Sequence, residues 1–469
     1  MKYETIIGLE VHTELLTNSK IFCPCTTKFG GEPNTHVCEV CMGLPGTLPT
    51  LNKKAVELAI RAGLVTNCDI TKFNKFDRKN YFYPDLPKAY QISQLYLPIC
   101  QNGYVELSKK KVRIKEIHME EDAGKLIHCQ SGETLVDYNR CGVPLLEIVS
   151  EPDMKSADEA IEYLEKLKAI LQYAEISDCK MQEGSLRADI NLSVRQVGQE
   201  KLGVRTEMKN MSSFKAVRKA IEAESKRQIE VLERGEKVLQ QTRRWDENKN
   251  MSFPMRTKEE ARDYKYFPEP DIPPIEISDE QIEEVRKKLP ELREQKKERY
   301  KKEYNLNEQD IKILLDCVNL TKIFEQTQRL TNNAKESAKW ITGEVLRLAR
   351  EKQILADDIN FNIQSLSEII ELLDNGKINR GTAKDVFEKV FYDDINPQKY
   401  IEENNLGLMT DLSQIKKTIE NVLAQNEKSV AEYKNGKTQA MQYLIGQSMK
   451  ALRGKAPAKE VAKILKEII

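Results

Sequence analysis

The chain has 469 residues, and its 74 Lys and Arg balance its 74 Asp and Glu to a formal net charge of +0. This balance argues against a simple polycation that coats nucleic acid, although it allows a local basic face. The length suits about three domains of ~100–200 residues each, and no run approaches the ~18 consecutive apolar residues of a membrane span. We therefore expect a globular, cytoplasmic protein with no membrane partner.

The N-terminal run from residue 5 to residue 15, TIIGLEVHTEL, predicts a strand rather than a signal peptide, because no basic start precedes an apolar segment. Glu10 and His12 are two residues apart in it, so their side chains share a face. The pair is either solvent-facing on an edge strand or a pair of metal ligands. Carboxylates with an occasional imidazole suit Mg²⁺ or Mn²⁺.

Four of the ten cysteines form two close pairs, Cys23-Pro-Cys25 and Cys38-Glu-Val-Cys41, separated by twelve residues. Two such pairs allow four thiolates to converge on one tetrahedral ion, and a chain without an export signal is not expected to form a disulfide framework. The alternative is four reduced cysteines. We expect Zn²⁺ here, in a closed site that is structural rather than catalytic.

The segment 76–94, FDRKNYFYPDLPKAYQISQ, mixes basic, aromatic and polar residues. Arg78, Lys79 and Lys88 are candidates for phosphate contacts, and the tyrosines are candidates for the wall of a pocket. A tyrosine-rich packing loop explains the composition equally well.

The stretch from residue 117 to residue 153 contains acidic residues among apolar ones: Glu120, Glu121 and Asp122, and then Glu147 inside LLEIV. An unpaired buried carboxylate is costly, so it needs a cation, a proton or a metal beside it. A buried salt bridge to an arginine is one explanation. A divalent ion shared with the first strand is the other, and it would explain why carboxylates gather.

Two later segments add charges of both signs. In MQEGSLRADINLSVR, Arg187 and Asp189 share a strand face, and EMKNMSSF adds Lys209 before a helix that Ser212 or Ser213 would cap. Alternating carboxylates and cations on several strands suit a nucleoside triphosphate with its metal, where catalysis consists mainly of positioning and charge stabilisation.

Strand-like runs and helical runs such as residues 157–174 do not alternate regularly in the first part of the chain, which indicates an α+β fold with a largely antiparallel sheet. A proline-rich segment, residues 266–278, is expected to be extended, and helical patterns rich in Lys and Glu follow it. We expect three domains: residues 1–290, 291–400 and 401–469.

The last of these segments is locally basic, with residues that include Lys434, Lys437 and Lys450. Lysines on a helical surface are usually only solvated, but a basic face on a neutral chain also suits contact with a phosphate backbone.

Six motifs occur in this order: GLEVH, FDRKNYFYPDLPKAYQISQ, HMEEDAGK, DYNRCGVPLLEIVSEPD, EGSLRADINLSVR and DYKYFPEPDIPP. Together they strongly resemble the B subunits of the aspartyl/glutamyl-tRNA(Asn/Gln) amidotransferases, the GatB family. The resemblance covers the whole chain, including a tail, GKTQAMQYLIGQSMKALRGKA, that is similar to the family's YqeY-like domain. Cys141, Ile190 and Ser212 depart from the usual pattern, and none of these differences removes a charged group.

The resemblance implies a two-step reaction in a heterotrimer. ATP activates the side-chain carboxylate of a glutamate or aspartate misacylated onto tRNA, and ammonia displaces phosphate to give Gln-tRNA(Gln) or Asn-tRNA(Asn). Ammonia comes from a glutamine-hydrolysing amidase, the A subunit, and a small C subunit holds the pair together. The first domain is a cradle related to glutamine synthetase. The helical middle domain and the tail would hold the tRNA.

Three alternatives stay open: a non-catalytic tRNA-binding scaffold, a stand-alone ligase using free ammonia, and the related archaeal protein that serves only Glu-tRNA. By position, the resemblance implies metal, catalytic and phosphate-binding roles for charged residues of the first domain. These are Glu10, His12, Glu121 and Glu147 for Mg²⁺, Lys79, Glu121 and Asp189 for catalysis, and Arg78, Arg187 and Lys209 for phosphate or terminal-adenosine contacts.

Overall fold

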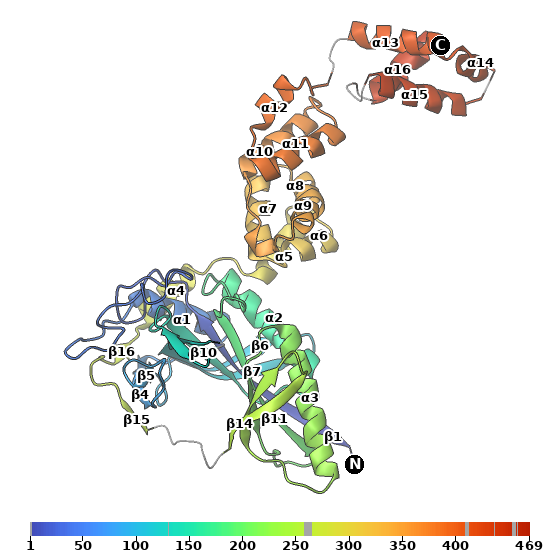
Figure 1. Cartoon of the computed structure of the whole chain (residues 1–469). Helices are drawn as coiled ribbons and strands as arrows, with labels where there is room; N and C mark the ends of the chain where they lie inside the picture. Colours follow the sequence, from blue (N-terminus) through green and yellow to red (C-terminus); the bar gives the residue numbers. More distant parts are fainter. Residues whose placement is uncertain are drawn as a thin grey trace. The chain divides into compact units, whose positions relative to one another are not determined.

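The computed structural model describes residues 2–129, 131–257, 265–408, 412–435, 437–452, 456 and 458–469. Its contacts divide the chain into two compact units, residues 1–293 and 294–469 (Figure 1). Among the described residues, no helix combines the length and apolar character needed to cross a membrane.

A nine-stranded sheet forms the centre of the first unit, in the order β14-β13-β12-β11-β1-β10-β7-β6-β2. Neighbouring strands are antiparallel except β12 and β13, which are parallel. The expected largely antiparallel sheet is therefore confirmed. The strands are β1 Tyr3–Glu14, β2 Asp69–Ile70, β6 Cys100–Glu106, β7 Lys111–Glu121, β10 Pro144–Ser150, β11 Leu186–Gln196, β12 Thr206–Lys209, β13 Gln241–Asp246 and β14 Met251–Thr257.

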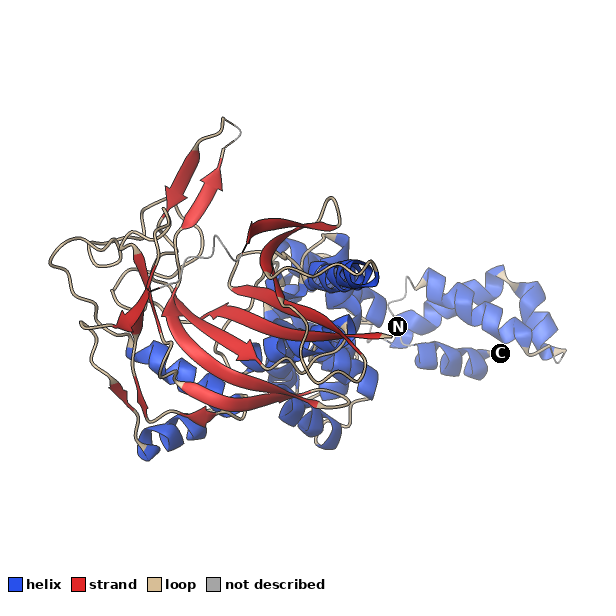
Figure 2. Cartoon of the chain, turned by 90° about the horizontal axis from the view of Figure 1, so that it is seen from below, coloured by secondary structure: helices blue, strands red, loops and turns tan. Residues whose placement is uncertain are grey.

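The alternation of side chains along β1 decides which face of the sheet is covered. Ile7, Leu9 and Val11 are fully buried, whereas Glu10 and His12 on the other face are only half-buried. Helices pack on the apolar face (Figure 2). They are α1 Lys53–Val65, α2 Ala157–Tyr173 and α3 Phe214–Glu233.

Local sequence explains where these helices begin. Asn52, Ser156 and Ser213 each accept a hydrogen bond from a backbone N–H of the first turn of α1, α2 and α3. Ser213 rather than Ser212 is therefore the cap of α3. The covering of one face leaves the polar face of β1 available for a site.

Smaller sheets complete the first unit. Strands β15 (Lys265–Pro268), β4 (Asp77–Asn80) and β5 (Tyr90–Ser93) form a three-stranded sheet, and β16 (Ile275–Glu276) pairs with β3 (Phe73–Asn74). The proline-rich segment is thus extended, as expected, and joins two strands from the N-terminal part. Strands β8 (Lys125–His128) and β9 (Thr134–Asp137) form a hairpin that projects at the upper left of Figure 2. Helix α4 (Asp279–Lys287) packs on α1.

Every regular element described in the second unit is a helix, so the expected change from a sheet-rich to a helical region is confirmed. Trp340 and Phe387 pack edge to face at 5.5 Å in its core, and Ile419, Leu444 and Leu465 belong to a separate core near the C-terminus. The helices are α5 Arg293–Lys302, α6 Glu308–Leu314, α7 Val318–Thr331, α8 Ala334–Trp340, the π-helix Ile341–Val345, α9 Leu346–Glu351, the 3₁₀ turn Ala356–Asp358, α10 Ile363–Asp374, α11 Arg380–Asp393, α12 Pro397–Glu403, α13 Leu412–Gln425, α14 Glu427–Lys434, α15 Gln439–Ala451 and α16 Ala458–Ile468.

Candidate active site

A cleft of about 440 Å³ lies over the polar face of the nine-stranded sheet. Glu10, His118 and Glu147 line it from β1, β7 and β10, and Lys79 and Tyr266 line it from the three-stranded sheet. Charged side chains from segments far apart in the sequence therefore face one cavity.

Strand register explains why these side chains converge. His12 lies opposite Glu147 on β10 and Arg187 on β11, and Glu147 lies opposite His118 on β7. In antiparallel strands, residues directly opposite one another share a face. A row of ionisable side chains therefore crosses four strands, and a second row, one pleat away, contains Glu10 and Asp189.

The first group of possible metal ligands consists of His12, Glu120 and Glu147, whose donor atoms lie within 4.8 Å of one another. His12 Nε2 is 3.6 Å from Glu120 Oε1 and 3.7 Å from Glu147 Oε1. Burial raises the pKa of Glu120 to about 7, and the Glu147 carboxylate adds to this effect. Burial lowers the pKa of His12 well below its ordinary value, which keeps the imidazole in its neutral, ligating form.

The second group of possible metal ligands consists of Glu10, Asp189 and Glu207. A lysine side chain, that of Lys209, lies against two of these carboxylates. Lys209 forms ion pairs with Asp189 and, at 2.8 Å, with Glu207. Burial alone would lower the pKa of Lys209, but these two carboxylates raise it overall. Burial, followed by the Glu147 charge, raises the pKa of Glu10. The structure thus groups Glu10 with Asp189 rather than with His12, because the two β1 residues lie about 7 Å apart along the strand.

Glu121 does not reach either group. Glu121 pairs with Pro144, three residues along each strand from the pair of His118 and Glu147, and this odd number places its side chain on the opposite face of β7. Lys88 Nζ lies 2.6 Å from its carboxylate, and Ile92 N–H donates to it at 2.9 Å. The expectation that Glu121 joins His12 and Glu147 is thus not met, and Glu120 occupies that place.

A signal for this choice was present in the sequence. Ile117 and Met119 are fully buried apolar residues, and their two-residue spacing marks the covered face of β7. Glu116, His118 and Glu120 therefore share the cleft face. His118, whose Nε2 lies 3.3 Å from Glu116 Oε1, was not predicted from the sequence either.

The predicted cations on β4 and β11 differ in their surroundings. Lys79 faces the cleft, where burial lowers its pKa but the Glu120 carboxylate and its neighbours raise it overall, so the ammonium stays charged. Arg187 donates to Asp122 at 2.7 Å. Arg78, next to Lys79, points away from the cleft, as alternation on a strand requires.

The Arg78 guanidinium joins β4 to the segment after β15. It donates to Glu269 at 2.6 Å and to Asp271 at 2.9 Å, and it lies 4.3 Å from the centre of the Tyr90 ring. Arg78 is not on the lining of the cleft, and neither are Arg187 and Lys209. Their contacts with phosphate stay predictions.

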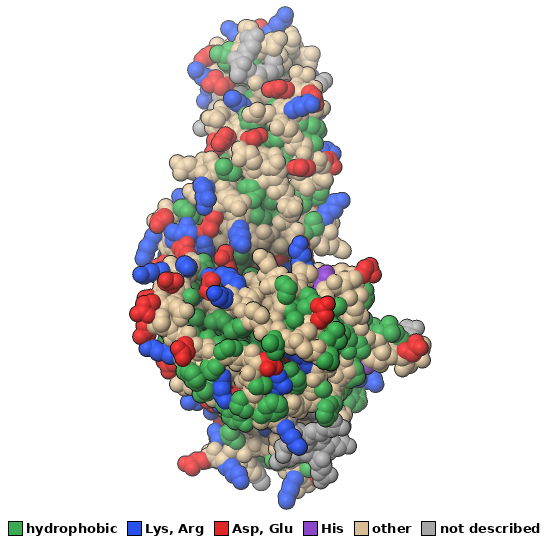
Figure 3. All heavy atoms as spheres, turned by 90° about the vertical axis from the view of Figure 1, so that its left-hand side faces the viewer, with side chains coloured by type: hydrophobic (Ala, Val, Ile, Leu, Met, Phe, Trp, Pro, Cys, Tyr) green, Lys and Arg blue, Asp and Glu red, His purple; other side chains and the backbone are tan. Residues whose placement is uncertain are grey.

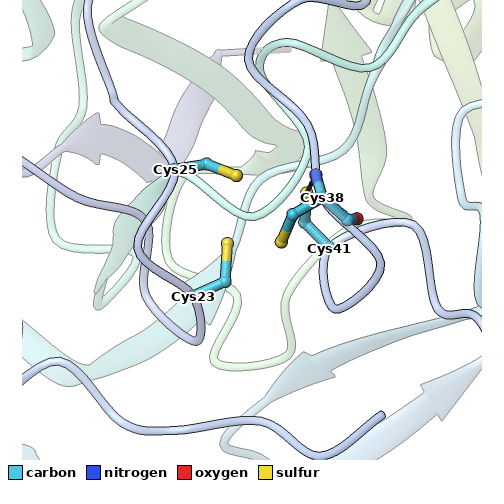
Figure 4. Close-up of side chains that lie close together, drawn as sticks. All are labelled: Cys23, Cys25, Cys38 and Cys41. Carbon is cyan, nitrogen blue, oxygen red and sulfur yellow. Dashed lines mark hydrogen bonds between the residues drawn. The ribbon is translucent and has the colours of Figure 1, made fainter. Parts of the chain in front are cut away.

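The four predicted zinc ligands converge (Figure 4). The sulfur atoms of Cys23, Cys25, Cys38 and Cys41 lie within 4.8 Å of one another. A hydrogen bond from the Cys23 thiol, aided by the nearby Lys20 ammonium, lowers the pKa of Cys41 to about 5. Four sulfurs that include a thiolate are the donor set that structural zinc uses.

Comparisons with known proteins agree with the motifs. Residues 5–283 match the sequence model of the GatB/GatE catalytic domain, and residues 322–469 match that of the GatB domain. The B subunit of the aspartyl/glutamyl-tRNA(Asn/Gln) amidotransferase from Lachnoclostridium phytofermentans is 60% identical to this chain, covering 100% of this chain and 99% of the relative. The proteins of the same name from Agathobacter rectalis and Caldicellulosiruptor bescii are each 56% identical with the same coverage. The chain therefore belongs to the GatB family, the B subunits of the aspartyl/glutamyl-tRNA(Asn/Gln) amidotransferases.

Proposed function

We propose that this chain performs the ATP-dependent step of transamidation. It activates the side-chain carboxylate of glutamate on tRNA(Gln), or of aspartate on tRNA(Asn), as an acyl phosphate and directs ammonia onto it. The observation that carries this proposal is the group of His12, Glu120 and Glu147, because its member Glu147 lines the cleft together with the charged Lys79. A scaffold that only bound tRNA would have no need for carboxylates whose burial is costly.

The charged residues in and beside the cleft suit the transfer of a phosphoryl group to a carboxylate. The donor set of His12, Glu120 and Glu147 fits Mg²⁺, which when bound would reduce the repulsion between two anionic reactants. Lys79 is positioned to stabilise the charge that develops on the transferred group. Lys209, fixed between Asp189 and Glu207, supplies a second cation, and Arg187 is oriented by Asp122.

The rest of the proposal concerns the assembly. We assign ammonia production to an amidase partner, the A subunit of a heterotrimer, and a stabilising role to its small C subunit, all in the cytoplasm. Phe29, Leu48 and Phe82 are 70%, 66% and 74% exposed, and Figure 3 shows hydrophobic side chains gathered on one side of the chain. Exposed apolar surface of this kind supports contact with another protein.

The same proposal covers the architecture. The one-sided antiparallel sheet with its charged cleft supports a cradle of the glutamine-synthetase type, with structural Zn²⁺ on the four cysteines. Residues 291–400 and 401–469 would hold the tRNA. The separate core of α13, α15 and α16 supports a division near residue 400.

The test is ATP hydrolysis by the assembled complex with Mg²⁺ and misacylated Glu-tRNA, in the absence of glutamine and ammonia. Hydrolysis should depend on the misacylated tRNA and fall roughly 100-fold or more in Glu120→Gln. Glu165→Gln, an exposed carboxylate on α2, is the matched control and should leave the rate unchanged. Full hydrolysis by Glu120→Gln together with weaker tRNA binding would support the scaffold instead.

A further inference from the structure

The loop between the two cysteine pairs is hydrogen-bonded to the base of the β8–β9 hairpin. Asn34 makes three of these bonds. Its backbone N–H donates to Asp137 Oδ1 at 3.1 Å, its side-chain amide donates to the Val136 carbonyl at 3.0 Å, and its side-chain carbonyl accepts from Tyr138 N–H at 2.8 Å. One asparagine of the loop therefore pairs with three consecutive residues at the end of the hairpin.

A second asparagine makes the same connection from the other side. Asn139 Oδ1 accepts from His36 N–H at 2.8 Å, and its amide donates to the Glu32 carbonyl at 2.8 Å. The Cys141 thiol also donates to the carbonyl of Cys41 at 3.5 Å. The contacts thus run from the hairpin to residue 141, and one of them ends on a predicted zinc ligand.

The chain held in this way lies against the end of β7. Gly142 N–H donates to the Asp122 carbonyl at 2.9 Å, and Asp122 N–H donates to the Val143 carbonyl at 2.9 Å. The Arg140 guanidinium donates to the carbonyls of Ala123 and Gly124 at 3.0 Å and 2.9 Å. The connection from β7 to β10 is therefore fixed on one side by the cysteine loop. Glu120 lies at the end of β7, just before this connection, and Glu147 lies in β10, just after it.

We propose that Asn34 and Asn139 are positioning residues through which the cysteine loop sets the ends of β7 and β10, and with them the carboxylates of Glu120 and Glu147. Residues 26–37 form no helix or named strand, so closing the loop on one ion would remove most of its freedom. The hydrogen bonds of the two asparagines would then restrict the motion of the segment that joins β7 to β10. The link to turnover rests on the function proposed above, whereas the mechanical link does not.

Asn34 allows a selective test because its backbone has φ +60°, in the left-handed region. Glycine adopts this conformation without strain, so Asn34→Gly removes the two side-chain bonds and leaves the turn unchanged. Asn67→Gly is the matched control. Asn67 has φ +59° at the end of α1, and its side chain donates only to the Tyr104 carbonyl at 3.4 Å.

The experiment is hydrogen exchange by mass spectrometry on the full chain loaded with Zn²⁺, with metal content measured in parallel. In Asn34→Gly and in Asn139→Ala, peptides covering residues 122–128 and 133–143 should exchange about tenfold faster with bound zinc unchanged. Removal of the metal by a chelator should produce the same pattern. Asn67→Gly should match the wild type in these peptides.

Faster exchange confined to residues 28–37 would overturn the proposal, because the loop would then be ordered independently of the strands. If Asn34→Gly bound less zinc, the test would rest on Asn139→Ala, whose change lies outside the loop. Faster exchange of residues 122–128 in that variant would support the proposal, and unchanged exchange there would overturn it.

Turnover supplies a readout that a purely structural role would not move. In the tRNA-dependent ATP hydrolysis assay, Asn34→Gly should lower kcat about tenfold and change KM for ATP less than about twofold, because misplaced ligands weaken the transition state more than ground-state binding. A rise in KM with unchanged kcat would contradict positioning. If the wild type shows no tRNA-dependent ATP hydrolysis, the proposed function is refuted. Faster exchange in the variants would in that case still support the mechanical link between the cysteine loop and the strands.

Discussion

Glu120 and Glu121 are neighbours in the chain, but their carboxylates lie on opposite faces of β7. Glu120 lies beside His12 on the cleft face and accepts a hydrogen bond from the Ser93 hydroxyl at 3.2 Å. Glu121 is neutralised by Lys88 on the other face, where a second cavity of about 170 Å³ adjoins it. The two residues therefore form a matched pair for testing which one binds a divalent ion.

We predict that Glu120→Gln weakens Mn²⁺ binding about tenfold or more, because it removes one of two anionic donors from the group. Glu121→Gln should change the affinity less than about twofold, because its carboxylate is not part of that group. Electron paramagnetic resonance of free Mn²⁺ in a titration of the full chain measures both. Equal losses in the two variants would mean that the ion lies between the faces, against the register described above.

Glu224, on α3, makes a contribution to the free energy of unfolding that depends on pH. It is 1% exposed on α3, and it accepts hydrogen bonds from Thr206 at 2.9 Å, Gln228 at 3.0 Å and Arg227 at 2.6 Å. Burial raises its pKa, but the bonds from Arg227 and Gln228 lower it below 4.5 overall. Because the pKa is lower in the folded state, this stabilisation is present above pH 4.5 and is lost as the pH falls through the folded-state pKa.

We predict that Glu224→Gln lowers the free energy of unfolding by about 1–3 kcal/mol at pH 7 and that the difference shrinks below pH 4.5. The chain has two tryptophans, so a Trp340→Phe background leaves Trp245 as a fluorescence reporter of the first unit in urea. Glu222→Gln, an exposed carboxylate on the same helix, is the control. A difference that does not depend on pH would show that packing, not charge, holds Glu224.

At the scale of single residues, period-two spacing was enough to place Glu10 and His12 on one face of β1. It was not enough to choose between neighbours such as Glu120 and Glu121 without using the buried Ile117 and Met119 as a reference. Spacing along one strand also cannot tell which residues of the neighbouring strands lie beside Glu10 and which beside His12, and these partners place the two residues in different groups.

At the scale of elements, Arg78 connects β4 to the segment that follows β15 through its ion pairs with Glu269 and Asp271. Its partner Glu269 has a side chain that is fully buried (0% exposed), so removing the guanidinium would leave a buried carboxylate without its cation. Long-range pairings of this kind, such as Lys265 opposite Asn80 and Ile275 opposite Asn74, could not be predicted from the sequence. Proline indicated only an extended segment, and nothing local identifies a partner so far upstream. Helix α2, in contrast, was predictable because its apolar spacing and its cap are both local.

We predict that Arg78→Met makes the amides of residues 265–271 exchange about tenfold faster or more, while KM for ATP changes less than about twofold. Lys79→Met, one residue along the same strand, should leave the exchange of residues 265–271 unchanged and should lower the rate of tRNA-dependent ATP hydrolysis. Hydrogen exchange and steady-state kinetics on the two variants provide the comparison. A large rise in KM for ATP in Arg78→Met with unchanged exchange would restore the phosphate contact expected from the sequence.

At the scale of the whole molecule, charge is balanced overall but not locally. The composition predicted a neutral protein, and the change in residue pattern after the proline-rich segment predicted the change from sheet to helix. The first domain expected from the sequence, residues 1–290, contains α4, but the sequence did not predict that α4 packs on α1, because a helical pattern does not specify which core a helix joins. The boundary near residue 400 stays a prediction.

The exposed lysines of the tail, Lys434, Lys437 and Lys450, test whether this segment contacts tRNA phosphates. We predict that changing all three to alanine weakens tRNA binding and lowers the slope of log affinity against log salt by about 0.7–0.9 for each phosphate that is no longer neutralised. Filter binding at several salt concentrations measures the slope. Changing Lys166, Lys226 and Lys237 of the first unit to alanine removes the same number of charges and is the control for net charge. Because a general charge effect would lower the slope in both variants, a decrease confined to the tail variant would mean direct binding of phosphates, and equal decreases would mean that the tail lysines are merely solvated.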